Sequence, residues 1–125
     1  MKRIVIVGGG AAGFFAAIAC AEKGPGAEIV VLEKTAQFLS KVKISGGGRC
    51  NVTHACFDGR DFATRFPRGE RALIAPFTQF QAADTVQWFA ERGVKLKTES
   101  DGRMFPTTDS SRTIIDCLLA TADLR

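Results

Sequence analysis

The segment Lys2–Lys34 places the strongest constraint on what this chain can fold into. An apolar run at residues 4–7 leads into three glycines spaced as G-x-G-x-x-G, and an alanine-rich stretch follows over residues 14–23. A second apolar run at residues 28–32 comes after the breaker Gly24-Pro25-Gly26. This order predicts a strand, a tight turn, a helix and a second strand, which is the opening βαβ unit of a Rossmann-like dinucleotide-binding fold.

Each glycine of the motif has a separate expected role. Gly8 allows the sharp exit from the strand, where φ can be positive. Gly10 lets a pyrophosphate approach the backbone, and Gly13 lets the helix pack close to the strand. Glu33 follows Gly13 by 20 residues, the spacing of the carboxylate that accepts hydrogen bonds from an adenosine ribose. Because a carboxylate repels a 2′-phosphate, the motif favours FAD or NAD over NADP. The alternative is a glycine-rich loop in another kind of α/β protein.

The middle of the chain has weaker patterns. Residues 57–76 predict irregular structure with one short helix around Phe62. A longer helix is expected over residues 79–92, and Gly93 provides its stop signal. Trp88 borders the apolar face of that helix and is expected to pack rather than to stack on a cofactor. The predicted apolar face consists of Phe80, Ala83, Val86, Phe89 and Ala90.

The last third predicts a hairpin and a helix. Residues 94–99 alternate between apolar and polar side chains, which is typical of a strand with one wet face. Asp101-Gly102 is a strong hairpin signal, and Pro106 should cut short the return strand at residues 103–105. An amphipathic helix is expected to follow Asp109 as its N-cap. Its apolar side chains would be Ile114, Ile115, Leu118, Leu119 and Ala122.

Together these patterns predict an α/β chain in three segments. Residues 1–34 form the βαβ core, residues 35–76 a glycine- and arginine-rich loop segment, and residues 77–125 a helix, a hairpin and a helix. The 125 residues, 46% of them hydrophobic, suffice for one small domain. Only two strands suit a parallel sheet, so we expect the N-terminal part of a larger protein, truncated before its substrate domain.

The net charge of +4 is concentrated in one segment. Residues 41–71 hold seven basic and three acidic side chains, and the rest of the chain is neutral. A nucleic-acid patch would explain this surplus, but no nucleic-acid-binding motif accompanies it. Neutralisation of the phosphates of a bound cofactor explains the surplus as well, and so does a solvated loop. We therefore expect no nucleic-acid partner.

The N-terminus and the cysteines bear on the compartment. Residues 4–21 carry no charge after a basic start, which imitates a signal peptide, but the glycines at motif spacing argue against one. The helix within this run is too short to span a bilayer, so no membrane partner is expected. No CxxC pair occurs, and one histidine cannot complete a zinc finger, so we expect no metal. Cys20, Cys50, Cys56 and Cys117 are expected to be free thiols in a reducing cytoplasm.

A second glycine cluster, SGGGRCN, spans Ser45–Asn51. Three consecutive glycines suit a loop rather than the interior of a helix or strand, because ordering them costs backbone entropy. Their backbone N–H groups can line up against an anion. Arg49 adds a planar fork of donors, and Asn51 adds a donor and an acceptor. The alternative for Arg49 is a surface arginine.

This cluster, the N-terminal glycine motif and the sequence DGRMFP at residues 101–106 resemble the aminoacetone-oxidase-like family of bacterial FAD-binding NAD(P)/FAD-dependent oxidoreductases. The resemblance covers nearly the whole chain. It departs at Leu39-Ser40-Lys41, where family members commonly have Gly-Arg-Lys, and at His54, where they often have Asn or Asp.

The resemblance implies a flavoprotein with two dinucleotide-binding domains and non-covalently bound FAD. The glycine turn would hold the pyrophosphate, Glu33 would hold the adenosine ribose, and the second cluster would lie over the pyrophosphate, the ribityl chain or the flavin ring. Arg103 would belong to a hairpin near the substrate. The implied cofactor contacts are Gly8, Gly10, Ala11, Ala12, Gly13, Glu33, Lys34, Lys41, Ser45, Gly46, Gly47, Gly48, Arg49, Cys50 and Asn51.

The predicted function is that of the N-terminal FAD-binding segment of a flavin-dependent oxidoreductase. Its flavin would carry the hydride, its substrate would be a small molecule, and NAD(P)H or oxygen would be the redox partner. The missing C-terminal part of the same protein would complete it. The alternatives are NAD bound on the same motif, and a truncated nucleotide-binding module without activity of its own.

No side chain is assigned as catalytic. Cys50 as a redox partner of the flavin competes with a buried spectator thiol, the simpler interpretation because no resolving cysteine lies at CxxC spacing. His54 as a proton donor competes with a hydrogen-bonded loop histidine. Asp101 is a turn residue first, and Lys95 and Lys97 are the solvent face of a strand.

Overall fold

The computed structural model describes residues 1–24 and 26–123. Pro25 of the predicted breaker and the last two residues of the predicted C-terminal helix segment lie outside this range. The chain divides into two compact units. The first comprises residues 1–50 together with the segment that begins at Ser110, and the second comprises residues 51–109.

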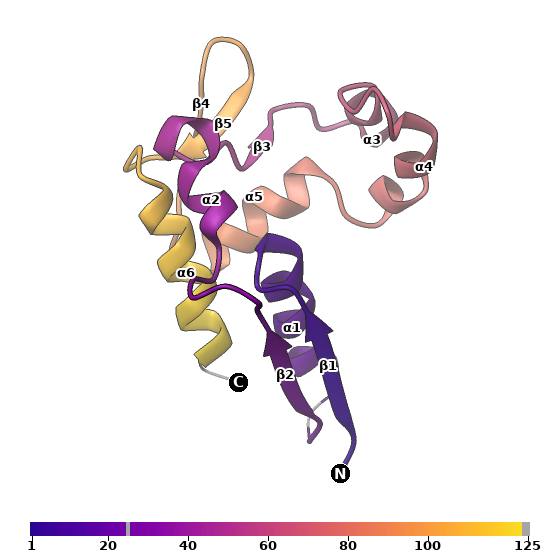
Figure 1. Cartoon of the computed structure of the whole chain (residues 1–125). Helices are drawn as coiled ribbons and strands as arrows, with labels where there is room; N and C mark the ends of the chain where they lie inside the picture. The colour runs from indigo at the N-terminus through magenta and orange to yellow at the C-terminus, as the bar shows by residue number, and fades with distance from the viewer. Residues whose placement is uncertain (25, 124–125) are drawn as a thin grey trace. The chain divides into compact units, whose positions relative to one another are not determined.

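The first unit contains the predicted βαβ arrangement. Strand β1 (Arg3–Val7) pairs in parallel with β2 (Glu28–Leu32), in a register that sets Val5 opposite Val30. Helix α1 (Ala11–Lys23) connects the two strands and contacts both of them. Figure 1 shows α1 beside this two-stranded sheet. The prediction of a Rossmann-like α/β fold is therefore confirmed.

Helix α1 provides the core of this unit together with α6 (Ser111–Asp123). Phe14, Ala17 and Ile18 of α1 are buried, and the two helices contact each other. The buried face of α6 largely follows the predicted pattern. Its buried residues are Ser111, Ile114, Ile115, Cys117, Leu118 and Thr121.

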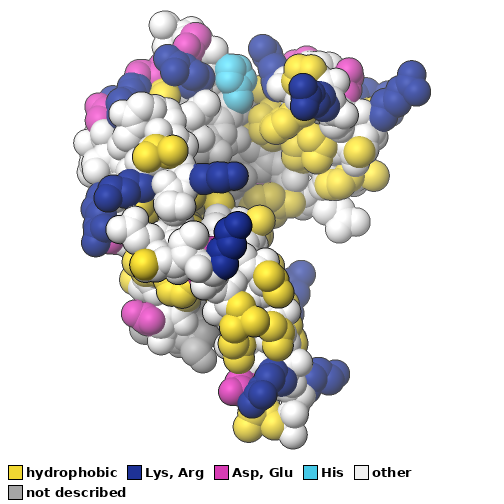
Figure 2. Space-filling model, viewed as in Figure 1, with side chains coloured by type: hydrophobic (Ala, Val, Ile, Leu, Met, Phe, Trp, Pro, Cys, Tyr) yellow, Lys and Arg dark blue, Asp and Glu magenta, His cyan; other side chains and the backbone are white. Residues whose placement is uncertain are grey.

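The described residues cover only one of the two faces of the parallel sheet. Ile4 and Ile6 are half-buried, whereas Val5 is 50% exposed, Val7 84% and Leu32 52%. Figure 2 shows the resulting hydrophobic surface where β1 and β2 lie in Figure 1. Parallel sheets in complete α/β domains are buried on both faces. The open face therefore agrees with the expectation that these residues are part of a larger protein.

One short helix of the first unit was not predicted. Helix α2 (Ser40–Ile44) follows Leu39, whose backbone is left-handed at φ 59° although its side chain is almost fully buried. The N–H of Leu39 donates to the carbonyl of Gly9 (2.8 Å), which fixes this conformation. At its other end, the carbonyl of Lys43 accepts from the Ser111 hydroxyl (2.8 Å). Tertiary contacts, and not local sequence, therefore define α2.

The second unit is built on a small antiparallel sheet in the order β3-β5-β4. Its strands are β3 (Thr53–His54), β4 (Leu96–Thr98) and β5 (Arg103–Pro106), and Phe105 at the centre is fully buried. The Asp101-Gly102 hairpin joins β4 to β5 with Gly102 at φ 91°, so the hairpin prediction is confirmed. The return strand extends one residue past its predicted end, because Pro106 is part of β5 and lies opposite Leu96.

Helix α5 (Ala82–Glu91) begins with a capping box formed by Gln81 and Asp84 and is followed by Gly93 in a left-handed conformation. Its predicted apolar face is only partly correct. Phe89 is buried as expected, but Phe80, Ala83 and Ala90 are exposed, and the buried alanine is Ala82. The buried face of α5 differs from the predicted one because the helix starts at Ala82, so Phe80 lies outside the helix.

Residues 57–80 contain more helix than predicted. The expected short helix around Phe62 is α3 (Gly59–Ala63), capped by the Asp58 carboxylate, which accepts from the N–H groups of Arg60 and Asp61. Helix α4 (Glu70–Ile74) and the 3₁₀ turn η2 (Pro76–Thr78) follow. These elements of three to five residues leave no hydrophobic periodicity for sequence analysis to detect.

The prediction that Asp109 caps α6 is wrong. Asp109 has a left-handed backbone (φ 56°), and its carboxylate binds Lys97 Nζ at 2.6 Å. Ser110 Oγ instead accepts from the N–H of Arg112, which is the N-cap contact of this helix. Because of this ion pair Lys97 is half-buried. Of the two lysines that were predicted on the solvent face of the strand, Lys95 is the exposed one.

Gly13→Ala tests the close approach of α1 to the strand. A Cβ at Gly13 would lie 1.9 Å from the Gly8 carbonyl oxygen, a backbone atom that cannot move aside. We expect the free energy of unfolding, measured with urea, to fall by about 1–3 kcal/mol. Ala16→Ser, at an exposed position of the same helix, is the control and should change it by less than about 0.5 kcal/mol. Equal stability of the two variants would refute the close packing.

Candidate nucleotide-binding site

The glycine turn between β1 and α1 is held by backbone contacts. Gly8 has φ 107°, as predicted for a residue at the strand exit, and its N–H donates to the carbonyl of Leu32 (2.7 Å). Gly13 sits where any side chain would collide with Gly8, so its predicted packing role is confirmed. Two of the three motif glycines are therefore required by the fold itself.

Gly10 is different because the fold does not require a glycine there. Its backbone is extended (φ −94°, ψ −166°), a conformation open to any residue, and a Cβ built on it would meet nothing within 4 Å. The residue is exposed. The space beside Gly10 is therefore free, as close approach of a ligand to the backbone requires.

The N-terminus of α1 points donors toward the same space. Gly10 is the N-cap and contributes no side-chain acceptor, and the first turn contains no acidic residue. The first intrahelical bond runs from the N–H of Phe14 to the carbonyl of Gly10 (3.0 Å). The N–H groups of the first turn therefore have no helical acceptor, and the positive end of the helix dipole is uncompensated there. Ala11 and Ala12 are exposed, so an anion has access to this end.

Glu33 at the end of β2 is tied to the glycine turn. One carboxylate oxygen accepts from the Gly9 N–H (2.9 Å), and the other accepts from the N–H and the hydroxyl of Thr35 (both 2.8 Å). These donors, the Thr35 N–H foremost and then the Gly9 N–H, hold the pKa of Glu33 below its ordinary value. The carboxylate is therefore ionised at neutral pH and keeps lone pairs for further donors.

Sequence analysis assigned no role to Gly9, which is buried in this turn. A Cβ there would lie 2.3 Å from the Phe38 ring and 3.2 Å from Glu33. The Phe38 ring also packs edge-on against Phe14 of α1 (5.2 Å between centroids). The middle glycine thus lets the chain after β2 fold back over the turn, and its place inside an uninterrupted glycine triplet was the only available signal.

The second glycine cluster forms a left-handed turn. Gly46, Gly47 and Gly48 have φ values of 55°, 67° and 90°, and the 3₁₀ turn η1 (Ser45–Gly48) includes them. The N–H of Cys50 closes the turn on the carbonyl of Ser45 (3.0 Å). All three glycines are exposed, which matches the loop predicted from their backbone entropy. Successive glycine N–H groups in such a turn are available to an anion.

The other predicted contacts in and near this cluster differ in exposure. Lys34 and Lys41 are exposed cations, and Arg49 is half-buried with a partner of its own. Cys50 is buried with φ 61°, and burial raises the pKa of its thiol, which stays protonated at neutral pH. This supports the spectator interpretation of Cys50. Asn51 is exposed and belongs to the second unit.

The hairpin of the second unit places the remaining candidates. The Arg103 N–H, and then its side chain (Nε to Oδ2, 2.7 Å), hold the pKa of the Asp101 carboxyl below its ordinary value. Asp101 lies in the turn before β5. The His54 ring lies against Gly102, where a Cβ would be 2.5 Å from Nε2. His54 is half-buried, opposite Arg103 in the β3–β5 register.

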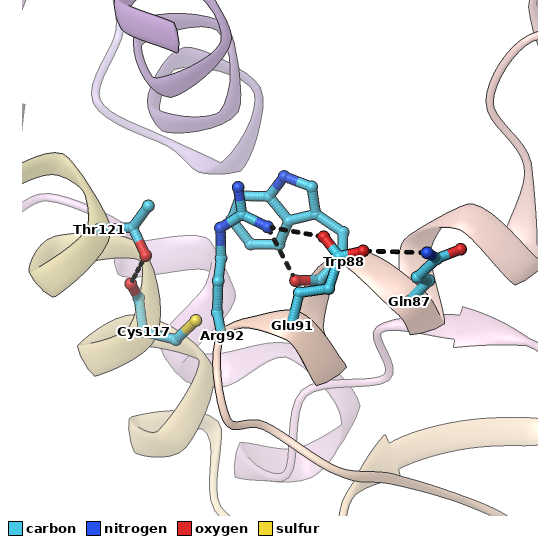
Figure 3. A network of polar contacts seen from close by, with 6 residues as sticks. All are labelled: Gln87, Trp88, Glu91, Arg92, Cys117 and Thr121. Carbon is cyan, nitrogen blue, oxygen red and sulfur yellow. Dashed lines mark hydrogen bonds and ion pairs between the residues drawn. The ribbon is translucent and has the colours of Figure 1, made fainter.

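Trp88 packs within its own helix, as predicted. Figure 3 shows the Arg92 guanidinium over the indole ring (3.7 Å to the centroid), with its Nη1 donating to the Trp88 carbonyl (2.9 Å). Gln87 donates to Glu91 one turn away. The cluster closes the C-terminus of α5.

The described residues show no metal-binding cluster, no disulfide and no helix that could span a membrane. Among residues 1–24 and 26–123, no group of histidine, cysteine and acidic side chains is placed to hold a metal ion. Cys20, Cys50, Cys56 and Cys117 form no disulfide. Within the part of the chain that the structure describes, no helix is both long and apolar enough to span a membrane.

Comparison with known proteins identifies relatives of the chain. It is 32% identical over 118 residues to a 3-dehydro-bile acid delta(4,6)-reductase of Clostridium scindens, covering 94% of this chain and 28% of that protein. It is 28% identical over 115 residues to a ribosomal RNA dihydrouridine synthase of Escherichia coli, covering 92% and 27%. A Haemophilus influenzae protein of the same name is 26% identical over 119 residues, covering 95% and 28%.

The chain thus spans less than a third of the length of the curated relatives it matches. Residues 2–125 match the HI0933-like protein Rossmann domain. The match includes the glycine turn, Glu33 and the second glycine cluster. With the βαβ unit observed and nearly every residue inside the match, the chain belongs to the HI0933-like protein Rossmann domain family.

Proposed function

We propose that this chain is the FAD-binding segment of a flavin-dependent oxidoreductase. The observation that carries the proposal is the open space at Gly10, beside a helix N-terminus with free donors. Neither the backbone conformation nor the packing explains a glycine at this position. An anion that approaches the backbone does explain it, and a pyrophosphate has the required charge and size.

Glu33 fits the adenosine end of the same cofactor. Its carboxylate is ionised and anchored by Gly9 and Thr35, so it is oriented before any ligand binds. Ribose hydroxyls can donate to its remaining lone pairs. A 2′-phosphate would be repelled by the same charge, which favours FAD or NAD over NADP.

The second glycine cluster would supply further contacts to the phosphates or to the flavin. Its three glycines and the neighbouring Lys41 are exposed, and Arg49 adds positive charge from a half-buried position. When bound, the flavin supplies the hydride chemistry, and the chain's own residues bind and orient it. NAD on the glycine turn alone would leave this cluster without a role.

We infer that the complete protein reduces a small-molecule substrate and takes electrons from NAD(P)H or passes them to oxygen. The names of the relatives support reduction, since one is a reductase and two are dihydrouridine synthases. The comparisons do not single out the aminoacetone-oxidase-like group, which stays a prediction. The proposed partner of this segment is a C-terminal part of the same protein, and the proposed compartment is the cytoplasm.

An absorbance spectrum of the purified protein tests the cofactor directly. We expect flavin bands that co-elute with the protein in gel filtration and are released as FAD on denaturation. A matched sample incubated with NAD should retain none. A full-length protein that retains NAD but not FAD would contradict the proposal.

Gly10→Val should block the cofactor without unfolding the protein. The extended backbone of Gly10 suits valine, and its side chain would occupy the space beside the helix N-terminus. We expect FAD affinity, measured by fluorescence quenching, to fall at least ~100-fold, as for loss of a charged backbone contact. The control Ala36→Val, at an exposed loop position, should bind normally. Normal affinity in Gly10→Val would place the pyrophosphate elsewhere.

Glu33→Ala should weaken FAD binding by roughly ten-fold or more, whereas Glu33→Gln, which keeps one acceptor oxygen, should lose less. Glu28→Ala, at the exposed opposite end of β2, is the control. Because the pKa of Glu33 is lowered, its contribution exists at neutral pH and is lost only as pH falls through that lowered value. Affinity should therefore be constant between about pH 6 and 8 on account of this group. Unchanged affinity in Glu33→Ala would exclude the residue from the site.

A further inference from the structure

Residues 57–80, here called the arginine–phenylalanine segment, form a surface that the nucleotide site does not use. The segment consists of α3, α4 and η2, which contact one another within the second unit. It carries four arginines and four of the chain's ten phenylalanines between Phe57 and Phe77, with Phe80 at its end. In Figure 2, dark blue cationic atoms and yellow hydrophobic atoms lie together over α3 and α4.

The arginines of this segment project their charge into solvent. Arg60, Arg65, Arg68 and Arg71 are all exposed. Within the described residues, Arg60, Arg68 and Arg71 have no acidic side chain as a partner, whereas Arg65 lies near the Cys56 thiol.

The acidic residues of the same segment are engaged locally. Asp58 caps α3, Asp61 accepts from the Cys56 thiol (3.3 Å), and Glu70 occupies the first turn of α4, where it complements the helix dipole. The formal surplus of the segment is one positive charge, and the three carboxylates are held in local contacts while the guanidinium groups extend into solvent.

Aromatic rings are interleaved with these arginines. Phe62 is buried and stacks on Phe77 (4.7 Å between centroids), and Phe66 packs edge-on against Phe62 (5.3 Å) while remaining 39% exposed. Phe57 is 54% exposed. The two inner rings hold the segment together, and the outer rings are available for stacking.

We propose that the arginine–phenylalanine segment binds single-stranded RNA. Exposed rings on which bases stack, set among guanidinium groups that reach phosphates, are the combination that single-strand binding uses. From the sequence we expected no nucleic-acid partner, because no nucleic-acid-binding motif is present. Stacking surfaces of this kind, however, need no fixed motif. The proposal goes beyond the proposed function, because it adds an RNA ligand on a surface separate from the nucleotide site. Two relatives are named for action on ribosomal RNA.

A membrane surface fits these features less well. Membrane-surface helices separate an apolar face from a basic face along one amphipathic helix. Here α3 and α4 have five residues each, and the rings and the guanidinium groups alternate along the chain. Arginine also presents the planar fork that matches phosphate oxygens and stacks on bases.

The test measures binding of a fluorescein-labelled single-stranded RNA of about 20 nucleotides to the whole flavin-loaded protein by anisotropy, over a salt series. The variant Arg60→Gln/Arg68→Gln/Arg71→Gln should bind at least ~10-fold more weakly. The slope of log affinity against log salt should decrease by about 2, since each lost contact to a single strand accounts for roughly 0.7. The control Lys23→Gln/Lys95→Gln/Arg112→Gln, three exposed cations outside the segment, should leave both values unchanged.

Phe57→Ala separates stacking from charge. We expect it to weaken RNA binding about five-fold or more without changing the salt slope, because a lost base–ring contact releases no counterions. The matched control Phe57→Trp keeps a stacking ring and should restore binding. Equal loss in both variants would overturn the stacking role.

Two further outcomes would overturn the proposal. One is RNA affinity that the arginine triple variant does not change. The other is RNA that fails to bind while vesicles of phosphatidylcholine and phosphatidylserine bind through the same arginines. Flavin content and NAD(P)H oxidation should stay normal in all these variants. RNA binding by a protein that holds no flavin would contradict the proposed function but support the RNA-binding proposal. The failure of one proposal can therefore be told from the failure of the other.

Discussion

The contact between the Glu33 carboxylate and the Gly9 N–H is the one on which the first unit depends most. It joins the end of β2 to the turn that begins α1 through a hydrogen bond of 2.9 Å, and the bond from the Gly8 N–H to the Leu32 carbonyl joins the same two parts of the candidate site. The Leu39 N–H then adds the chain after β2 to the same turn through the Gly9 carbonyl. The N–H and the carbonyl of Gly9 are thus both hydrogen-bonded. A side chain at Gly9 would displace the Phe38 ring that packs against this residue.

The same turn shows why glycines in one motif need different explanations. Gly8 is required by its φ, and Gly13 by its distance from a neighbouring carbonyl. Only Gly10 is unexplained by the fold, and for that reason it carries information about a ligand. A ligand site is best identified by what folding leaves unexplained, since packing accounts for most glycines in tight turns.

Sequence patterns predicted the parts of the fold whose signals are local. The βαβ unit, the Asp101-Gly102 hairpin, the stop at Gly93 and the face of α6 each follow from periodicity or turn chemistry within a few residues. The turn geometry of Gly8 and Gly13 was likewise predicted from their fixed spacing, whereas the binding roles of the glycines and of Glu33 stay predictions. What the sequence could not supply depends on distant contacts. Leu39 adopts its left-handed backbone because Gly9 accepts its N–H, and β3 has two residues whose pairing exists only beside β5.

The cap of α6 illustrates the same limit on a smaller scale. Asp109 and Ser110 are both suitable N-cap residues, and the sequence alone favoured the aspartate. Lys97, twelve residues earlier, binds the Asp109 carboxylate and leaves the cap to the Ser110 hydroxyl. A competition of this kind is decided by the tertiary neighbour, because charge-assisted bonds are stronger than neutral ones.

The division of the chain has a consequence for the order in which it folds during synthesis. The first unit needs α6, from residues 111–123, to cover α1, whereas the second unit is complete by residue 109. The hairpin sheet of the second unit therefore leaves the ribosome whole while α1 still lacks its covering helix. The first unit, although it begins the sequence, is therefore the last to receive all of its residues, and the face of α1 that packs on α6 has no cover until then.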